Sequence, residues 1–235
     1  MIRMGKMRNA ILAVVLAAVT AATFALGGAP AWVVSAQERA AKVTAAKVTY
    51  APVPSGDYQI DPAHSIIGFS IRHLEIAWVE GRFKDFKGTI HFDESDVTKS
   101  SVEFSAKIES IDTGVEPRDK HLRTADFFDA AKYPEMSFKS TRVARRGKDG
   151  YVLHGDFTLK GVTKPVALPF TVTGAIKDPW GNTRFGVSAQ TKIDRRDYGI
   201  TWGKALENGG LDVGNEVTID LQLEAVKPAP KPAGQ

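Results

Sequence analysis

Apolar and polar residues alternate with a period of two through most of the chain between residues 56 and 226. In the clearest run, 101–111, every second residue up to Ile108 is apolar and the residues between are polar or charged. This pattern is typical of a β-strand with one buried and one solvated face. The sequence predicts about eight such strands, at 67–73, 86–92, 101–111, 136–143, 151–159, 166–176, 183–193 and 217–223.

Short turn-forming segments separate these strands, and one segment departs from the period of two. The turns fall at 93–96, 147–150, 160–161, 178–182 and 208–210, and short connections favour antiparallel neighbours. The exception, 117–131, has helical spacing. We expect Pro117 in its first turn, Thr124 as the cap of a second short turn, and Pro134 as its end.

Eight one-faced strands with a short helical insertion predict an all-β domain whose sheet must cover its apolar face. It can close into an antiparallel β-barrel or fold into a sandwich. We favour the eight-stranded barrel because closure leaves no long edge strand exposed.

The two ends of the chain differ from this pattern. Residues 1–36 combine three cations, an apolar run at 10–26 and small residues before a cleavage point after Ala36, which is typical of a secretory signal peptide. The alternative, an uncleaved anchor, is disfavoured by the short apolar run. We expect a flexible spacer at 37–55, one domain at 56–226 and a disordered Pro and Lys tail at 227–235. The protein is then exported, to the periplasm or the exterior.

Composition narrows the function further. The chain has no Cys, which excludes disulfides and thiolate chemistry. Three of its 31 Lys and Arg residues lie in the leader, and 27 Asp and Glu balance the rest, so no nucleic-acid surface is indicated. The five His residues form no metal-binding spacing, and no GxSxG or phosphate-binding glycine motif occurs. We therefore assign no catalytic residue and no metal ligand.

Two polar clusters are candidates for other roles. On a helix, Arg118, His121 and Leu122 share one face, and the Arg fork could hold a polar or pyrophosphate head group at the opening of a cavity. The alternative is structural: Arg118 pairs with an acid and pins the helix. The second cluster, 194–199 (DRRDYG), is interpreted as a turn at a strand end with local ion pairs.

Several sequence blocks resemble one known family. They are YQIDPAHSIIGFSIRHL at 58–74, VEGRFKDFKGTIHFD at 79–93, SIDTGVEPRDKHLRTADFFDAAKYPEMSFKST at 110–141 and RRDYG at 195–199. Over about 56–226 the chain resembles the YceI-like family of exported, lipocalin-like proteins that bind polyisoprenoids. The third block is the most specific, because TG, RDxHL, FFD and YPxxxF follow one another there in order.

This resemblance implies a lipocalin-like barrel that holds a long-chain isoprenoid lipid, either an isoprenoid quinone or a polyprenyl phosphate, for transport, storage or stress protection. It implies no enzyme activity and no covalent cofactor. Membrane association would be transient at most. Whether the protein forms a homodimer is left open. Residues that we select as ligand contacts are His73, Arg118, His121, Leu122, Phe127, Phe128 and Arg195.

Three alternatives remain at this point. One is an exported stress or interaction module with a packed core and no lipid, and another is an enzyme that acts on a lipid. The third, an outer-membrane barrel, is disfavoured because the outward faces carry Glu103, Lys107, Asp220 and Glu224.

Overall fold

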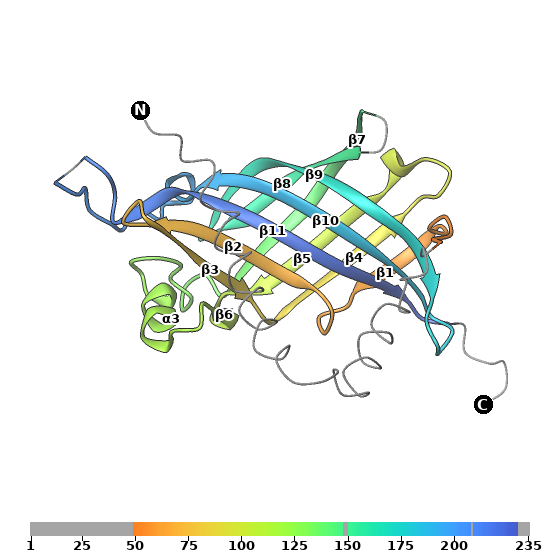
Figure 1. Cartoon of the computed structure of the whole chain (residues 1–235), viewed down its shortest axis with the longest axis horizontal. Helices are drawn as coiled ribbons and strands as arrows, with labels where there is room; N and C mark the ends of the chain where they lie inside the picture. The colour runs from red at the N-terminus through yellow and green to blue at the C-terminus, as the bar shows by residue number, and fades with distance from the viewer. Residues whose placement is uncertain (1–48, 148–149, 208, 230–235) are drawn as a thin grey trace, which may run out of the picture. The chain divides into compact units, whose positions relative to one another are not determined.

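A computed structural model of the chain describes residues 49–147, 150–207 and 209–229. The expected signal peptide at 1–36, most of the spacer and the end of the tail lie outside these residues. The domain that follows Thr49 is a closed antiparallel β-barrel (Figure 1). Its strands are β1 (Gly56–Ile60), β2 (Ile66–His73), β3 (Ala77–Phe83), β4 (Phe86–Phe92), β5 (Ser101–Lys107), β6 (Ile111–Asp112), β7 (Glu135–Arg146), β8 (Gly150–Leu159), β9 (Val162–Lys177), β10 (Thr183–Asp194) and β11 (Val213–Lys227).

Three pairs of these strands are interrupted pieces of longer ones. Strands β1 and β2 both pair with β11 and together form one long strand. In the next long strand, β3 pairs with β2 and β4 pairs with β1. In the third, β6 pairs with β3 and β5 pairs with β4. Counted this way the barrel has eight strands, and the pairing of β1 with β11 closes it. The predicted eight-stranded barrel is confirmed, and the sandwich alternative is wrong.

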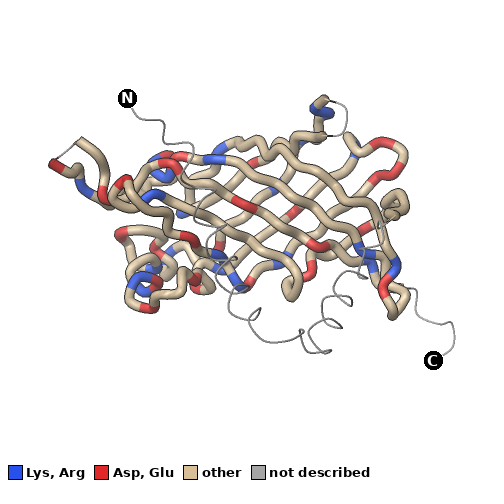
Figure 2. Tube along the Cα trace, viewed as in Figure 1, with Lys and Arg blue, Asp and Glu red and all other residues tan. Residues whose placement is uncertain are grey.

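Side-chain alternation follows the sequence pattern. In β5 and the turn after it, Ala106 and Ile108 are buried while Glu103 and Lys107 are exposed. Gly155 is required where β8 passes β7, because a Cβ there would lie 2.5 Å from the Lys139 carbonyl oxygen and closer still to a Phe ring. Acidic and basic residues are interspersed over the barrel (Figure 2).

Residues before the expected domain boundary at Gly56 already pack on the barrel. Ala51 forms an antiparallel bridge with Ala175, and Val53 is buried. The hydroxyl of Tyr58 donates to the Pro54 carbonyl at 2.7 Å. The last residues of the expected spacer thus belong to the folded domain, because Val53 adds an apolar side chain to the core.

The helical insertion is shorter than the sequence predicts. Helix α3 (Glu116–Arg123) has its proline in the first turn, as expected. However, Thr124 is not the cap of a second helical turn. Its hydroxyl donates to the His121 carbonyl at 2.8 Å and ends α3, and turns follow instead of a helix up to Pro134. The helix stops because its C-terminal carbonyls are satisfied locally.

At the far end of the barrel from α3, one arginine joins three acids. Arg184 donates to Asp61 and Asp178, each at 2.7 Å, and to Glu224. Burial of Asp61 by itself raises its pKa, but hydrogen bonds from His64 and Arg184 outweigh burial and lower the pKa to about 2. For Asp178, burial is likewise outweighed by the bonds from Arg184 and Asn182, and its pKa is about 2.

This network predicts acid sensitivity. Because both carboxyl pKa values are lowered in the folded state, their stabilisation is present above about pH 4 and is lost as the pH falls toward 2. Replacing Arg184 by methionine is expected to lower the free energy of unfolding at pH 7 by roughly 2 kcal/mol. The free energy of unfolding of the variant should also change less between pH 4 and pH 2 than that of the parent. Urea denaturation across this range measures both effects. An unchanged pH profile in the variant would contradict the assignment.

No helix among the residues that the structure describes is long and apolar enough to cross a membrane.

Candidate functional site

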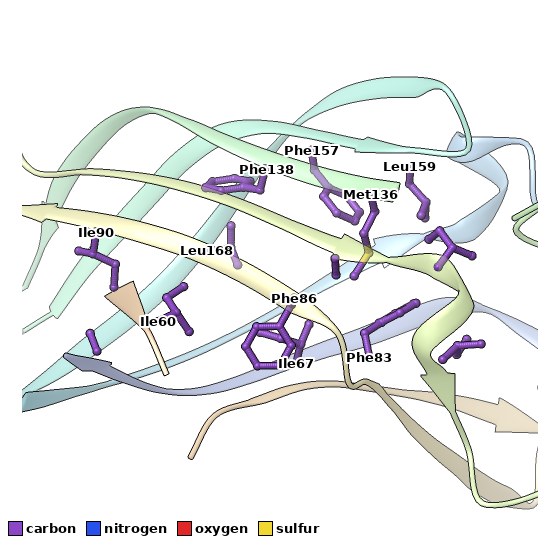
Figure 3. Close-up of a cluster of buried hydrophobic side chains, with 14 of the residues drawn as sticks. Ile60, Ile67, Phe83, Phe86, Ile90, Met136, Phe138, Phe157, Leu159 and Leu168 are labelled. Atoms are coloured by element: carbon purple, nitrogen blue, oxygen red, sulfur yellow. The ribbon is translucent and has the colours of Figure 1, made fainter. Parts of the chain in front are cut away.

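The interior of the barrel holds an elongated apolar cavity of about 240 Å³. This is many times the roughly 10–15 Å³ that one water molecule requires. Inward-facing side chains from all around the barrel form its wall, and Figure 3 shows several of them pointing into a shared interior. The aromatic members of the wall are Phe69, Phe83, Phe92, Phe104, Phe127, Phe128, Phe138, Phe157, Phe170 and Phe185.

The wall contains very few polar side chains. Among the described residues that line it, only Ser100, Thr191 and Arg195 have polar side chains. The Ser100 hydroxyl accepts from the Asp93 amide at 3.0 Å, and the Thr191 hydroxyl donates to the Ala167 carbonyl at 2.9 Å. A ligand inside this cavity is therefore held by burial of apolar surface.

Arg195, at the start of the short 3-10 helix η3 (Arg195–Tyr198), is 5% exposed and donates to the backbone. Its guanidinium donates to the carbonyls of Gly214 at 2.8 Å, Ile200 at 2.9 Å and Val213 at 3.1 Å. Burial lowers the pKa of this guanidinium from its usual value, but an arginine stays charged in proteins. Arg195 thus ties the loop after β10 to the start of β11.

The rest of the 194–199 cluster is a strand-end turn, as the sequence indicates. Asp194 accepts from the Arg196 amide at 2.9 Å and forms a two-nitrogen ion pair with its side chain. Gly199 ends η3 in the left-handed conformation, with φ of 69°, which glycine adopts at low cost.

One end of the cavity is covered by the α3 insertion. Asp119 is buried and accepts from the Thr113 amide at 2.9 Å and from its hydroxyl. Arg118 donates through two of its nitrogens to the Thr113 hydroxyl at 2.7 Å and carbonyl at 2.8 Å. Arg123 reaches the carbonyls of Glu109 and Ile111. These bonds fix α3 to the segment before it. Arg118 helps to hold the helix, as the structural alternative expects, but its partner is Thr113, and no ion pair with an acid is found among the described residues.

An aromatic cluster covers the same end. The rings of His121, Phe127 and Trp202 lie with their centres 5.0–5.1 Å apart. Phe127 is buried and lines the cavity, whereas Trp202 and His121 reach the surface. His121 shares a hydrogen bond of 2.8 Å with Asp126. An imidazole is therefore one aromatic ring away from the cavity.

The opposite end is closed by a buried aromatic group. The Tyr58 and Phe185 rings meet edge to face at 4.8 Å, and Phe92 packs on Phe185 at 5.6 Å. Tyr58 has no exposed surface, and burial raises the pKa of its hydroxyl. These three residues lie on β1, β4 and β10, so paired strands hold the aromatic group in place.

The structure brings four of the seven predicted contact residues to the cavity wall: Leu122, Phe127, Phe128 and Arg195. Arg118 and His121 lie in the insertion outside the wall. His73 is exposed at the end of β2, where the strand runs past the barrel, and it is not part of the lining. No local sequence pattern marks the packing of Trp202 on Phe127.

One group of potential metal ligands, Asp61, His64 and Glu224, lies close together in the described part of the chain. Its carboxylates are already paired with the Arg184 guanidinium, and we assign the group to that ion-pair network.

Comparison with known proteins gives the family. The model of the YceI-like domain matches residues 58–225. A UPF0312 protein of Photorhabdus laumondii is 47% identical over 146 residues, which cover 61% of this chain and 76% of that protein. Protein YceI of Escherichia coli is 45% identical over 148 residues, covering 62% and 77%.

Solved structures agree with the fold. BcnA of Burkholderia cenocepacia has a TM-score of 0.61 at 25% identity, covering 70% of this chain and 98% of that one. The Campylobacter jejuni YCEI protein has a TM-score of 0.58 at 31% identity, covering 72% and 96%. A polyisoprenoid binding domain from Saccharophagus degradans has the same fold, with a TM-score of 0.53 at 18% identity, covering 73% and 98%. This chain belongs to the YceI-like family.

Proposed function

We propose that this protein is an exported carrier that holds the tail of a long-chain polyisoprenoid in its barrel, for transport, storage or stress protection in the periplasm or outside the cell. The observation that carries the proposal is the cavity wall, which is apolar throughout except for three side chains that already have hydrogen-bond partners. Such a wall suits a slender hydrocarbon and offers nothing to a polar substrate. The polyisoprenoid binding domain with the same fold supports this choice of ligand.

The described residues of the cavity wall offer no arrangement of groups for a reaction on the lipid. Each of the three guanidinium nitrogens of Arg195 donates to a carbonyl, and no other ionisable side chain in the described wall faces the cavity. A nucleophile or general base needs such a group within reach of the reacting atom. We therefore propose binding without turnover.

The head group is proposed to lie at the α3 end, close to His121. Two nitrogens of Arg118 already donate to Thr113, which leaves only the remaining N–H groups of its guanidinium for a phosphate. An uncharged quinone ring needs only a single donor and can stack on aromatic side chains. The arrangement thus supports an isoprenoid quinone over a polyprenyl phosphate.

The proposal predicts a dependence on tail length. Each buried CH₂ contributes about 0.8 kcal/mol before losses, and ordering of the tail offsets much of it. We expect the affinity for prenols of increasing length to rise by about tenfold or more per isoprene unit until the cavity is filled, and then to level off. Intrinsic fluorescence titration measures this series.

The same titration with a quinone and a polyprenyl phosphate of equal tail length compares the head groups. Affinities that do not change along the prenol series would overturn the proposal.

A further inference from the structure

Three apolar side chains are displayed at the tip of the β2–β3 hairpin. Leu74 is 37% exposed, Ile76 is 77% exposed and Trp78 is 48% exposed. The hairpin runs past the barrel at the end where α3 lies (Figure 1). A protruding group of large apolar residues marks an interaction site more often than a lone exposed one does.

The backbone of the tip is unfavourable for the residues that occupy it. Leu74 and Glu75 both have positive φ, 51° and 59°, in a tight turn closed by the Ile76 amide on the His73 carbonyl at 3.1 Å. Asn and Gly are the residues that suit two successive positive φ angles in a hairpin. A leucine here disfavours the turn, and such local strain points to a role for the side chain outside the fold.

The tip is connected to the α3 end of the cavity. The Leu74 amide donates to the Asp212 carbonyl at 2.8 Å, and the Asp212 carboxylate accepts from the Lys204 amide at 2.8 Å. Two residues before Lys204, the exposed Trp202 packs on Phe127, which lines the cavity. Backbone hydrogen bonds through Asp212 and Lys204, and then the contact between Trp202 and Phe127, therefore connect the hairpin to the cavity wall.

Two cations lie beside the tip, whose turn also carries the exposed Glu75. The Arg72 guanidinium lies 4.5 Å from the centre of the Trp78 ring. Within the described residues, neither Arg72 nor Lys204 has a carboxylate partner for its side chain. Tryptophan beside an unpaired arginine is typical of the boundary between membrane and water, where the ring meets the head groups and the cation meets phosphate.

We propose that the β2–β3 tip, together with Trp202, docks on the surface of a phospholipid bilayer, with Leu74, Ile76 and Trp78 among the head groups and Arg72 and Lys204 against lipid phosphate. This inference rests on the proposed function, because docking at the α3 end would give a prenyl tail a short path from the membrane to the cavity. The contact is transient, since few apolar side chains insert.

The test is cosedimentation of the purified protein with vesicles of phosphatidylethanolamine and phosphatidylglycerol that contain no isoprenoid. We expect Ile76→Ser and Trp78→Ser each to weaken vesicle binding by roughly tenfold. Leu74→Asn should also weaken it while making the protein more stable to urea, because asparagine suits the positive φ. The matched control is Trp180→Ser. Trp180 is also 77% exposed but lies in the turn between β9 and β10, at the opposite end of the barrel, and vesicle binding should not change.

Docking would be overturned if the parent protein did not bind vesicles, or if Trp180→Ser lost as much vesicle binding as the hairpin variants. It would also be overturned by concentration-dependent self-association that the hairpin variants abolish, because a second copy of the chain would then cover the tip. Binding only to membranes that retain their proteins would place a protein partner there and would also overturn it. Prenol titration of the same variants separates the two proposals. Normal prenol affinity with no vesicle binding rejects docking alone, and vesicle binding without prenol affinity rejects the carrier.

Discussion

Replacing Arg195 by alanine is expected to lower the free energy of unfolding by about 3–5 kcal/mol, toward the lower end of what three buried carbonyls without a donor would cost. The variant leaves the carbonyls of Ile200, Val213 and Gly214 without their donor beside a dry cavity, and each buried unsatisfied group costs roughly 1–3 kcal/mol. The Tm should fall by roughly 10 °C for a domain of this size. Urea denaturation and calorimetry measure the two quantities.

Arg196 is the matched control. It is the next residue, but its side chain is 57% exposed and its partner is Asp194. An exposed pair of this kind contributes about 0–1 kcal/mol, so Arg196→Ala should be close to the parent. Lysine at position 195 should restore only part of the loss, because an ammonium cannot reach three carbonyls in the geometry of a planar fork. If Arg195→Ala were as stable as Arg196→Ala, the assigned role of Arg195 would be wrong.

The second large effect is expected from filling the cavity. Val187 lies on β10, and its side chain lines the cavity. Its backbone is paired with β9 on one side and β11 on the other. Replacement by tryptophan places an indole in space that we assign to the prenyl tail. We expect the affinity for long prenols to fall by about a hundredfold or more, because several buried CH₂ groups at about 0.8 kcal/mol each are displaced. The fold should persist, since the indole enters empty volume and is apolar.

Gln190→Trp is the control for this variant. Gln190 lies on the same strand with its side chain exposed, bonded only to Asp220. The added indole is then outside the barrel, and prenol affinity should equal that of the parent. Fluorescence titration with a long prenol compares the three proteins. Unchanged affinity in a folded Val187→Trp variant would show that the tail lies elsewhere.

The barrel could be predicted from the sequence because its strands carry one signal from end to end. Alternation places Ile67, Phe69 and Ile71 on one face of β2, and the structure puts these side chains on the cavity wall. The interruptions were not predictable in this way. The breaks between β1 and β2 and between β3 and β4 depend on how the long strands bend around a closed barrel, which is a property of the whole sheet.

The same alternation fails for His73. In the alternation of β2, His73 is on the same side as the residues that point inward. However, β2 extends beyond the barrel at this position, and the side chain is exposed. Whether a residue in phase reaches the interior depends on the length of the neighbouring strands, and a single strand carries no signal for that.

The candidate site was predictable in part, for a similar reason. Leu122, Phe127 and Phe128 were selected from the block that resembles the family, and all three line the cavity. The role of Arg195 could not be predicted, because its three carbonyl partners lie 5 to 19 residues further along the chain. The bond from Thr124 back to His121 decides where α3 ends, and helical spacing in the sequence does not show it.

The most direct test of the central claim is native mass spectrometry of the protein purified from its own host, followed by organic extraction and mass analysis of the extract. We expect a complex of one protein chain with one isoprenoid lipid, released on extraction with the mass of a quinone or a polyprenyl phosphate. The Val187→Trp variant, purified in the same way, should carry much less of it. A parent protein that is recovered without any lipid, or with a lipid that has no prenyl tail, would contradict the account.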